Sequence, residues 1–147
     1  MPIVAYHIDE ISAKKGGIPK GAVDIKSGSK IVSVDKTETG MFKKYDGIAV
    51  SFEFRTDYEP NVAEIVIRGK VVYAGEDVKE SLKTWGKEKK LVENVEVEVR
   101  NFLFRKCLGM GITITENMNL PPPLLFPMVA KRPKKNEINP KDLRYIG

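Results

Sequence analysis

The hydrophobic period of this chain changes once, near Gly75, and this change limits the folds that the chain can adopt. Before Gly75, apolar and polar side chains alternate, most clearly over Ile48–Arg55, where every second side chain is apolar. After Gly75, apolar side chains recur in steps of three and four residues, as on one face of a helix. Strands followed by helices predict an α+β fold, with a four-stranded antiparallel sheet and helices packed on one of its faces.

Four strands are predicted before Gly75. They are Ile3–Ala13, Lys30–Lys36, Ile48–Arg55 and Val62–Tyr73. A turn is predicted at Ser27–Ser29, before the second strand, and a hairpin joins the third and fourth strands, which are close in sequence. Gly69 interrupts the fourth strand, and a glycine inside a strand often marks a bulge or a bend.

The first strand has apolar side chains on both of its expected faces. A loose alternation places these residues on one face, together with the polar Asp9: Ile3, Ala5, His7 and Ile11. It places these on the other: Val4, Tyr6 and Ile8. We therefore expect both faces of this strand to be covered, at least in part.

Two helices are predicted after Gly75. The first covers 76–85 and ends at Gly86. The second begins at Glu88 and continues for about four to six turns with one apolar face. Gly109 and Gly111 weaken this helix by about 1 kcal/mol each relative to alanine, or mark its end.

The length of 147 residues suits a single domain, which we expect over 1–130, followed by a basic tail or short helix over 131–147. A hydrophobic fraction of 41% with 31% charged residues is typical of a folded, soluble protein. No signal peptide is evident, and the lone cysteine, Cys107, suits a reducing compartment, so we expect a cytoplasmic protein. Glutamine is absent while lysine and glutamate are abundant, a composition found in hyperthermophile proteins.

No catalytic or metal site is predicted, and neither is a cofactor. The one histidine, His7, lies in an apolar strand, and Cys107 lies on the apolar face of the second helix. One histidine and one cysteine cannot supply the three or four ligands of a metal site. Phosphate-binding glycine motifs are also missing. We therefore do not expect an enzyme.

The net charge of +5 is compatible with binding to nucleic acid. Against this, the lysines occur in pairs and are interleaved with glutamate and aspartate, which is typical of a solvated surface. A basic nucleic-acid-binding module is kept as one alternative, and a small-ligand-binding protein as another.

One segment, Leu120–Val129, is apolar although it has the prolines of a loop. Two explanations remain open for it. Either the segment packs under the domain or at an oligomer interface, or it lines an exposed groove for apolar ligands. Both can hold together.

Two short motifs resemble the SecB family of protein-export and holding chaperones. Arg105-Lys106-Cys107 resembles the Arg-x-Cys of the first long SecB helix, and Asn119–Pro123 resembles the Asn-Leu-x-Pro turn that follows it. The strand Ile65–Gly75 also resembles the SecB strand that ends in Ile-x-x-Gly or Val-x-x-Gly. The resemblance covers roughly Ile3–Val129.

The resemblance implies ATP-independent holding of unfolded or nascent polypeptides in apolar grooves by a homotetramer, a dimer of dimers with long helices in its interface. It implies these client-binding residues: Ile18, Pro19, Leu120, Pro122, Leu124, Leu125 and Phe126. It implies these interface residues: Val95, Val99, Phe102, Leu103 and Cys107. SecB proteins are typically acidic and this chain is basic, so a contact with the SecA motor is not expected, and the clients stay open between exported proteins, labile antitoxins and others.

Overall fold

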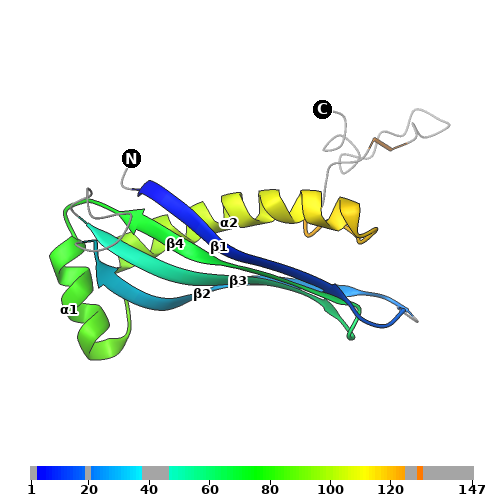
Figure 1. Cartoon of the computed structure of the whole chain (residues 1–147), viewed down its shortest axis with the longest axis horizontal. Coiled ribbons are helices and arrows are strands. Elements are labelled where there is room, and N and C mark those ends of the chain that lie inside the picture. Colours follow the sequence, from blue (N-terminus) through cyan, green and yellow to red (C-terminus); the bar gives the residue numbers. More distant parts are fainter. Residues whose placement is uncertain (1–2, 19–20, 38–46, 125–128, 131–147) are drawn as a thin grey trace, which may run out of the picture.

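A computed structural model describes residues 3–18, 21–37, 47–124 and 129–130, so the predicted tail over 131–147 lies outside the described residues. The elements are β1 (Ile3–Lys15), β2 (Asp24–Lys36), β3 (Ile48–Glu59), β4 (Ala63–Tyr73), α1 (Val78–Glu88) and α2 (Glu93–Asn117). The strands form one antiparallel sheet in the order β1-β4-β3-β2. α2 runs along one face of this sheet and α1 lies at one end (Figure 1). The predicted α+β class is confirmed.

β3 and β4 form the predicted hairpin, and the structure places it at the centre of the sheet. Alternate side chains of β3 point toward α2 and are buried, among them Val50, Phe52 and Phe54. Opposite them on β4, Ile67 and Val71 are buried as well. These side chains, together with the buried face of α2, make the hydrophobic core.

The predicted alternation in β1 is wrong, because two register shifts against β4 interrupt it, between Ile3 and Ala5 and between Ile8 and Glu10. Each shift adds one residue to β1 and so reverses the faces of the residues that follow. Tyr6, Ile8 and Ile11 therefore share one face, since they pair with Val71, Gly69 and Ile67, which face α2.

Gly69 marks the second of these bulges, as the sequence indicated. It pairs with Ile8, directly before the shift, and a Cβ atom added to Gly69 would lie 2.2 Å from the carbonyl oxygen of His7. The β1 backbone approaches β4 so closely here that only glycine fits.

The turn predicted at Ser27–Ser29 is wrong, because β2 continues through these residues. Ser27 and Ser29 pair with Thr56 and Phe54 of β3, and the hydroxyl groups of Ser27 and Thr56 lie 2.9 Å apart. The long partner strand supplies backbone hydrogen bonds that outweigh the local turn preference of a Ser-Gly-Ser sequence.

Both helices differ from their predicted limits. α1 continues through Gly86 to Glu88, and Lys89 ends it in the left-handed conformation, with φ of 56°. α2 begins at Glu93 rather than at Glu88, and it continues through both of its glycines to Asn117. A buried face along the whole helix compensates for the low helix propensity of glycine.

We predict opposite effects for two Gly→Ala substitutions. In Gly69→Ala the new methyl group clashes with the β1 backbone, which should lower the free energy of unfolding by about 2 kcal/mol. In Gly109→Ala the methyl group meets no atom within 4 Å, and the better helix propensity should raise the free energy of unfolding by about 1 kcal/mol. Urea denaturation followed by circular dichroism measures both, and equal midpoints for the two variants would contradict the close approach at Gly69.

Candidate functional site

The one helix that crosses the sheet is narrower than the sheet. Neighbouring strands lie about 4.8 Å apart, so the outer two of four strands are about 14 Å apart. An α-helix with its side chains is about 10–12 Å wide. The side chains of the central strands β3 and β4 that face α2 are buried, whereas several on the same face of the edge strands stay partly exposed.

One partly exposed apolar surface of this kind lies between β1 and α2. We call it the β1–α2 strip, and it consists of Tyr6, Ile8, Ile11, Phe102, Lys106 and Met110. Tyr6 is 44% exposed and Ile11 52% exposed, although both are on the α2-facing side of β1. Apolar side chains that stay exposed directly beside the hydrophobic core indicate an interaction site.

Aromatic contacts order the middle of the strip. The ring centroids of Tyr6 and Phe102 are 5.6 Å apart, with the ring planes tilted by 54°. The ammonium nitrogen of Lys106 lies 4.5 Å from the Tyr6 centroid, over the ring. Tyr6 is thus held between an aromatic side chain and a cation and still presents almost half of its surface to solvent.

The other flank of α2, which faces β2, combines a polar contact with an aromatic one. Arg100 donates hydrogen bonds of 2.8 Å to both the carbonyl and the hydroxyl oxygen of Ser29, and one of 2.9 Å to Glu96. Phe104 packs edge-on against Phe54, with the ring centroids 5.5 Å apart. These contacts attach α2 to the β2 side of the sheet.

The segment after α2 packs back on the rest of the chain. It contains three of the predicted client-binding residues, Leu120, Pro122 and Leu124. Leu120 is buried, and its amide donates a hydrogen bond of 2.9 Å to the carbonyl oxygen of Thr115. The hydroxyl of Tyr58 donates a hydrogen bond of 2.5 Å to the carbonyl oxygen of Pro121. Pro123 packs on Gly111, where an added Cβ would lie 3.3 Å from the proline ring.

The remaining predicted client residues differ in their surroundings. Pro122 and Leu124 are exposed, and Ile18 is 91% exposed on the segment after β1. That segment and the end of α2 lie at the same end of the molecule (Figure 1). Three other predicted client residues lie outside the described residues: Pro19, Leu125 and Phe126.

Most of the predicted interface residues belong to the core of the single chain. Val95, Val99, Leu103 and Cys107 are at most 1% exposed, because α2 packs them against the chain's own sheet. Phe102 alone of the five keeps exposed surface, as part of the strip. An interface along α2 would therefore have to use other residues of this helix.

The one cysteine and the one histidine of the chain, Cys107 and His7, have surroundings that suit a structural role. Burial raises the pKa of Cys107 to about 12, so its side chain stays a thiol near neutral pH. His7 lies 3.1 Å from Asp9 at the surface. Across the part of the chain that the structure describes, no group of three or more histidine, cysteine or acidic side chains could hold a metal ion. Neither α1 nor α2 combines the length and the hydropathy that crossing a membrane requires.

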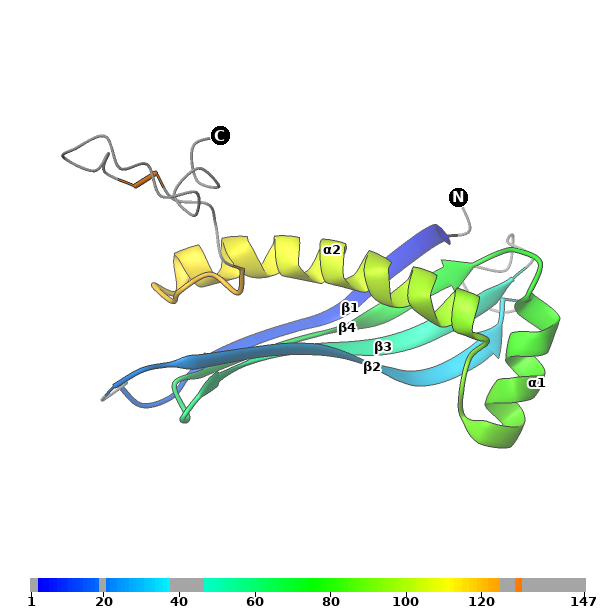
Figure 2. The same cartoon turned by 180° about the vertical axis from the view of Figure 1, so that it is seen from behind.

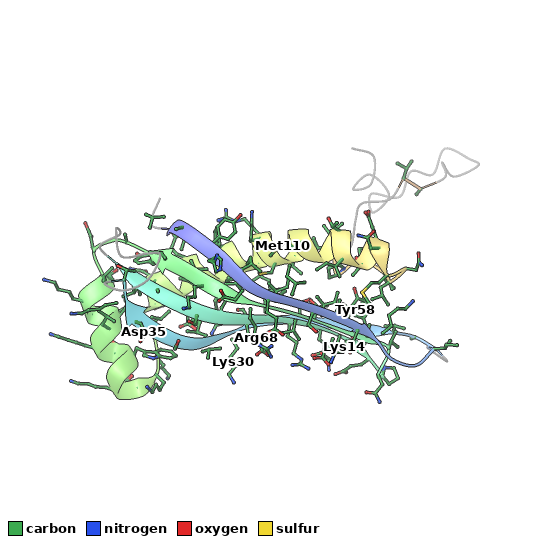
Figure 3. All side chains as sticks on the ribbon, in the orientation of Figure 1. Lys14, Lys30, Asp35, Tyr58, Arg68 and Met110 are labelled. Carbon is green, nitrogen blue, oxygen red and sulfur yellow. The ribbon has the colours of Figure 1, made fainter. Side chains whose placement is uncertain are left out.

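The sheet face opposite α2 carries ion pairs between strands. Arg68 on β4 contacts Glu10 on β1 at 3.0 Å and Glu53 on β3 at 3.2 Å. Arg55 contacts Glu64 across the same two central strands at 2.6 Å. Figure 3 places Arg68 and Lys30 on this face and Met110 on α2, so the charged and apolar surfaces lie on opposite sides of the sheet.

Comparison with known proteins supports the fold. No family model matches the chain, and no curated protein matches it in sequence. Among solved structures, it is similar to a SecB-like chaperone of Mycobacterium tuberculosis, solved in complex with a ChAD peptide from the HigA1 antitoxin. The TM-score is 0.50 at 18% sequence identity, over 82% of this chain and 81% of that chain. At this identity the likeness shows a SecB-like fold.

We predict that Tyr58→Phe loosens the segment after α2. The variant removes the hydrogen bond to the carbonyl oxygen of Pro121, and it should lower the free energy of unfolding by about 1–2 kcal/mol. Tyr6→Phe is the matched control, because Tyr6 is 44% exposed and its hydroxyl can bond to water in either state. Equal losses for the two variants in urea denaturation would show that the Tyr58 hydroxyl does not anchor the segment.

Proposed function

We propose that this protein is an ATP-independent holding chaperone that binds extended apolar segments of unfolded or nascent polypeptides. The observation that carries the proposal is the half-exposed β1–α2 strip, in which Tyr6 and Ile11 remain open beside the core. The SecB-like fold supports it, since the similar chaperone was solved with a peptide bound. We place its action in the cytoplasm, in keeping with the expectation from the sequence.

The chemistry of the strip suits weak binding of many sequences. Burial of apolar surface contributes roughly 25 cal/mol per Å² and does not depend on the order of side chains in the client. The rigid rings of Tyr6 and Phe102 lose little conformational entropy when they are covered. β1 is an edge strand of the described sheet, and an extended chain can add to such an edge through backbone hydrogen bonds. Because each contact is weak, a client can dissociate without energy from nucleotide hydrolysis.

The client surface is proposed to continue past the strip at the end of the molecule where α2 ends. Exposed apolar groups on Ile18, Pro122 and Leu124 would extend it. The neighbouring residues Pro19, Leu125 and Phe126, which lie outside the described residues, belong to the same proposal. Leu120 would contribute as the buried anchor of this surface rather than as a client contact.

A homo-oligomer is part of the proposal, with a dimer of dimers as the arrangement that the family resemblance implies. The side of α2 that faces away from the sheet has one large exposed apolar side chain, Val97, which is 51% exposed. The outer edge of β1 is a second candidate contact, because a strand edge can pair with another copy.

Binding to nucleic acid is less well supported. Lys26, Arg55 and Arg68 of the open sheet face each lie within 4 Å of a carboxylate, which lowers the positive potential there. Because the carboxylates of this face pair with these cations, the face does not present the acidic surface that a SecA-type motor would contact. We therefore do not propose that contact.

We predict that the strip protects unfolded proteins from aggregation. Light scattering of a chemically denatured client, diluted into buffer without nucleotide, should fall when the protein is added. The double variant Tyr6→Ser, Ile11→Ser should bind about 10-fold more weakly, because each substitution removes about 0.7–1 kcal/mol of apolar contact.

Val32→Ser is the matched control for this assay. Val32 is 53% exposed, almost the same as Ile11 at 52%, but it lies at a register shift of the opposite edge strand. Protection that is unchanged in the double variant, or reduced equally by Val32→Ser, would exclude the strip as the client site.

We also predict self-association. Light scattering coupled to size-exclusion chromatography should give a mass above the 16.5 kDa of one chain, and four times that value for a dimer of dimers. Val97→Lys should lower this mass if α2 forms a contact, since a buried charge is costly. A single-chain mass at all concentrations would refute the oligomer and leave the holding assay to judge the strip alone.

A further inference from the structure

The end of β4 and the starts of α1 and α2 lie at one corner of the molecule (Figure 2). An open depression with a volume of about 660 Å³ is lined by the end of β4, the residues before α1 and the start of α2. Four of its polar lining residues are acidic, and the other two are Tyr73 and Asn94. The residues that matter here are Tyr73, Gly75, Glu76, Asp77, Glu93 and Glu98. This corner is separate from the β1–α2 strip, so client binding does not depend on it, and it shares one residue, Val97, with the α2 contact proposed for the oligomer.

Tyr73 supplies a polar group at the wall of the depression. The residue is only 6% exposed, and none of the described residues forms a hydrogen bond with its hydroxyl. The hydroxyl oxygen would lie 3.1 Å from a Cβ atom added to Gly75, another lining residue, so the absence of a side chain there leaves the hydroxyl accessible from the depression. Among the described residues, Ser81 holds the one buried side-chain oxygen without a hydrogen-bond partner, so the Tyr73 hydroxyl is not sealed in the core and reaches the open space of the depression.

The carboxylates of the depression also lack partners. Within the described residues, no lysine, arginine or histidine forms an ion pair with Glu76, Asp77, Glu93 or Glu98. The acids of the open sheet face contrast with them, since Glu10, Glu53 and Glu64 each pair with an arginine.

Helix dipoles account for only part of this acidic charge. Glu76 and Asp77 precede α1, and Glu93 is the first residue of α2, where the positive end of a helix dipole stabilises a carboxylate. Each helix start contributes about half of a positive charge, which offsets about one of the four negative charges. Glu98 lies beyond the first turn of α2 and has no such explanation. A negative potential therefore remains over the depression.

The chemistry of the depression favours an organic cation over a metal ion. No group of three acidic side chains in the described residues is close enough to hold a metal. An alkylammonium group has three N–H donors, which can reach separate acceptors on carboxylates and on a phenol oxygen. Its carbon chain can contact Val97, which also lines the depression.

We propose that this depression binds a primary alkylammonium group, which pairs with Glu93 and Glu98 and donates a hydrogen bond to the Tyr73 hydroxyl. A free diamine and the lysine side chain of a polypeptide both carry this chemistry. The proposal concerns the site that recognises the ammonium group, and the two sources are separate arms of the test.

Isothermal titration of the folded protein with 1,5-diaminopentane, at constant ionic strength, tests the first source. The second source is tested with lysine that is acetylated on its α-amino group and converted to a methylamide at its carboxyl group, so that its side-chain ammonium group stays free. The uncharged control is 1,5-pentanediol. We expect saturable binding of at least one amine and none of the diol. The double variant Glu93→Gln, Glu98→Gln should weaken amine binding about 10-fold or more, since it removes both charge-assisted hydrogen bonds.

Two further variants separate the site from general electrostatics. Tyr73→Phe keeps the ring and the charges, so a loss of about threefold or more would report the hydroxyl itself. Glu116→Gln removes an exposed carboxylate elsewhere on α2 and should leave binding unchanged. Circular dichroism verifies that each variant is folded. Binding of neither amine, or equal weakening by Glu116→Gln, would overturn the proposal.

Discussion

In the part of the chain that the structure describes, one helix, α2, lies along the face of a four-stranded sheet, and the rest of this structure depends on that constraint. α2 packs Val95, Val99 and Leu103 onto β3 and β4 and excludes water from the centre of the sheet. It is too narrow to cover the edge strands as well. Apolar side chains of β1 that point toward the helix therefore meet it only at its flank, and their outer surfaces stay in water. The same geometry that builds the core also leaves an apolar surface beside it, on a rigid scaffold.

Charge is distributed so that this apolar surface is kept apart from the polar ones. The sheet face away from α2 pairs its charges across strands, as between Arg68, Glu10 and Glu53, which satisfies them locally. On the β2 side of α2, Arg100 binds the backbone and hydroxyl of Ser29 and attaches the helix. The corner depression differs from both surfaces, because its carboxylates have no cation among the described residues. The carboxylates of the corner depression lack a cationic partner within the described ranges, and the apolar side chains of the β1–α2 strip stay partly exposed. The requirements of folding alone explain neither feature.

The strip could not be found from the sequence, although its residues could. Alternation predicted the two faces of β3 correctly, because β3 pairs with β4 without a register shift. In β1, two bulges reverse the faces, so alternation assigned Tyr6 and Ile11 to opposite sides when both face α2. The motif at Asn119–Pro123 resembles a SecB turn, but the surroundings of its residues come from the structure alone, in which Leu120 is buried and Leu124 is exposed. The resemblance to SecB agrees with the fold of the similar chaperone.

The sequence by itself determined the order of strands and helices, the hairpin of β3 and β4, and the apolar face of α2. These follow from hydrophobic period, which is a local property of the chain. The tertiary structure decided which apolar side chains remain exposed, because exposure depends on bulge positions, strand order and the width of the covering helix. It also brought the acidic residues before α1 together with those of α2 around Tyr73, across a separation in sequence that no periodicity encodes. Contacts between distant segments therefore created both surfaces to which we assign binding.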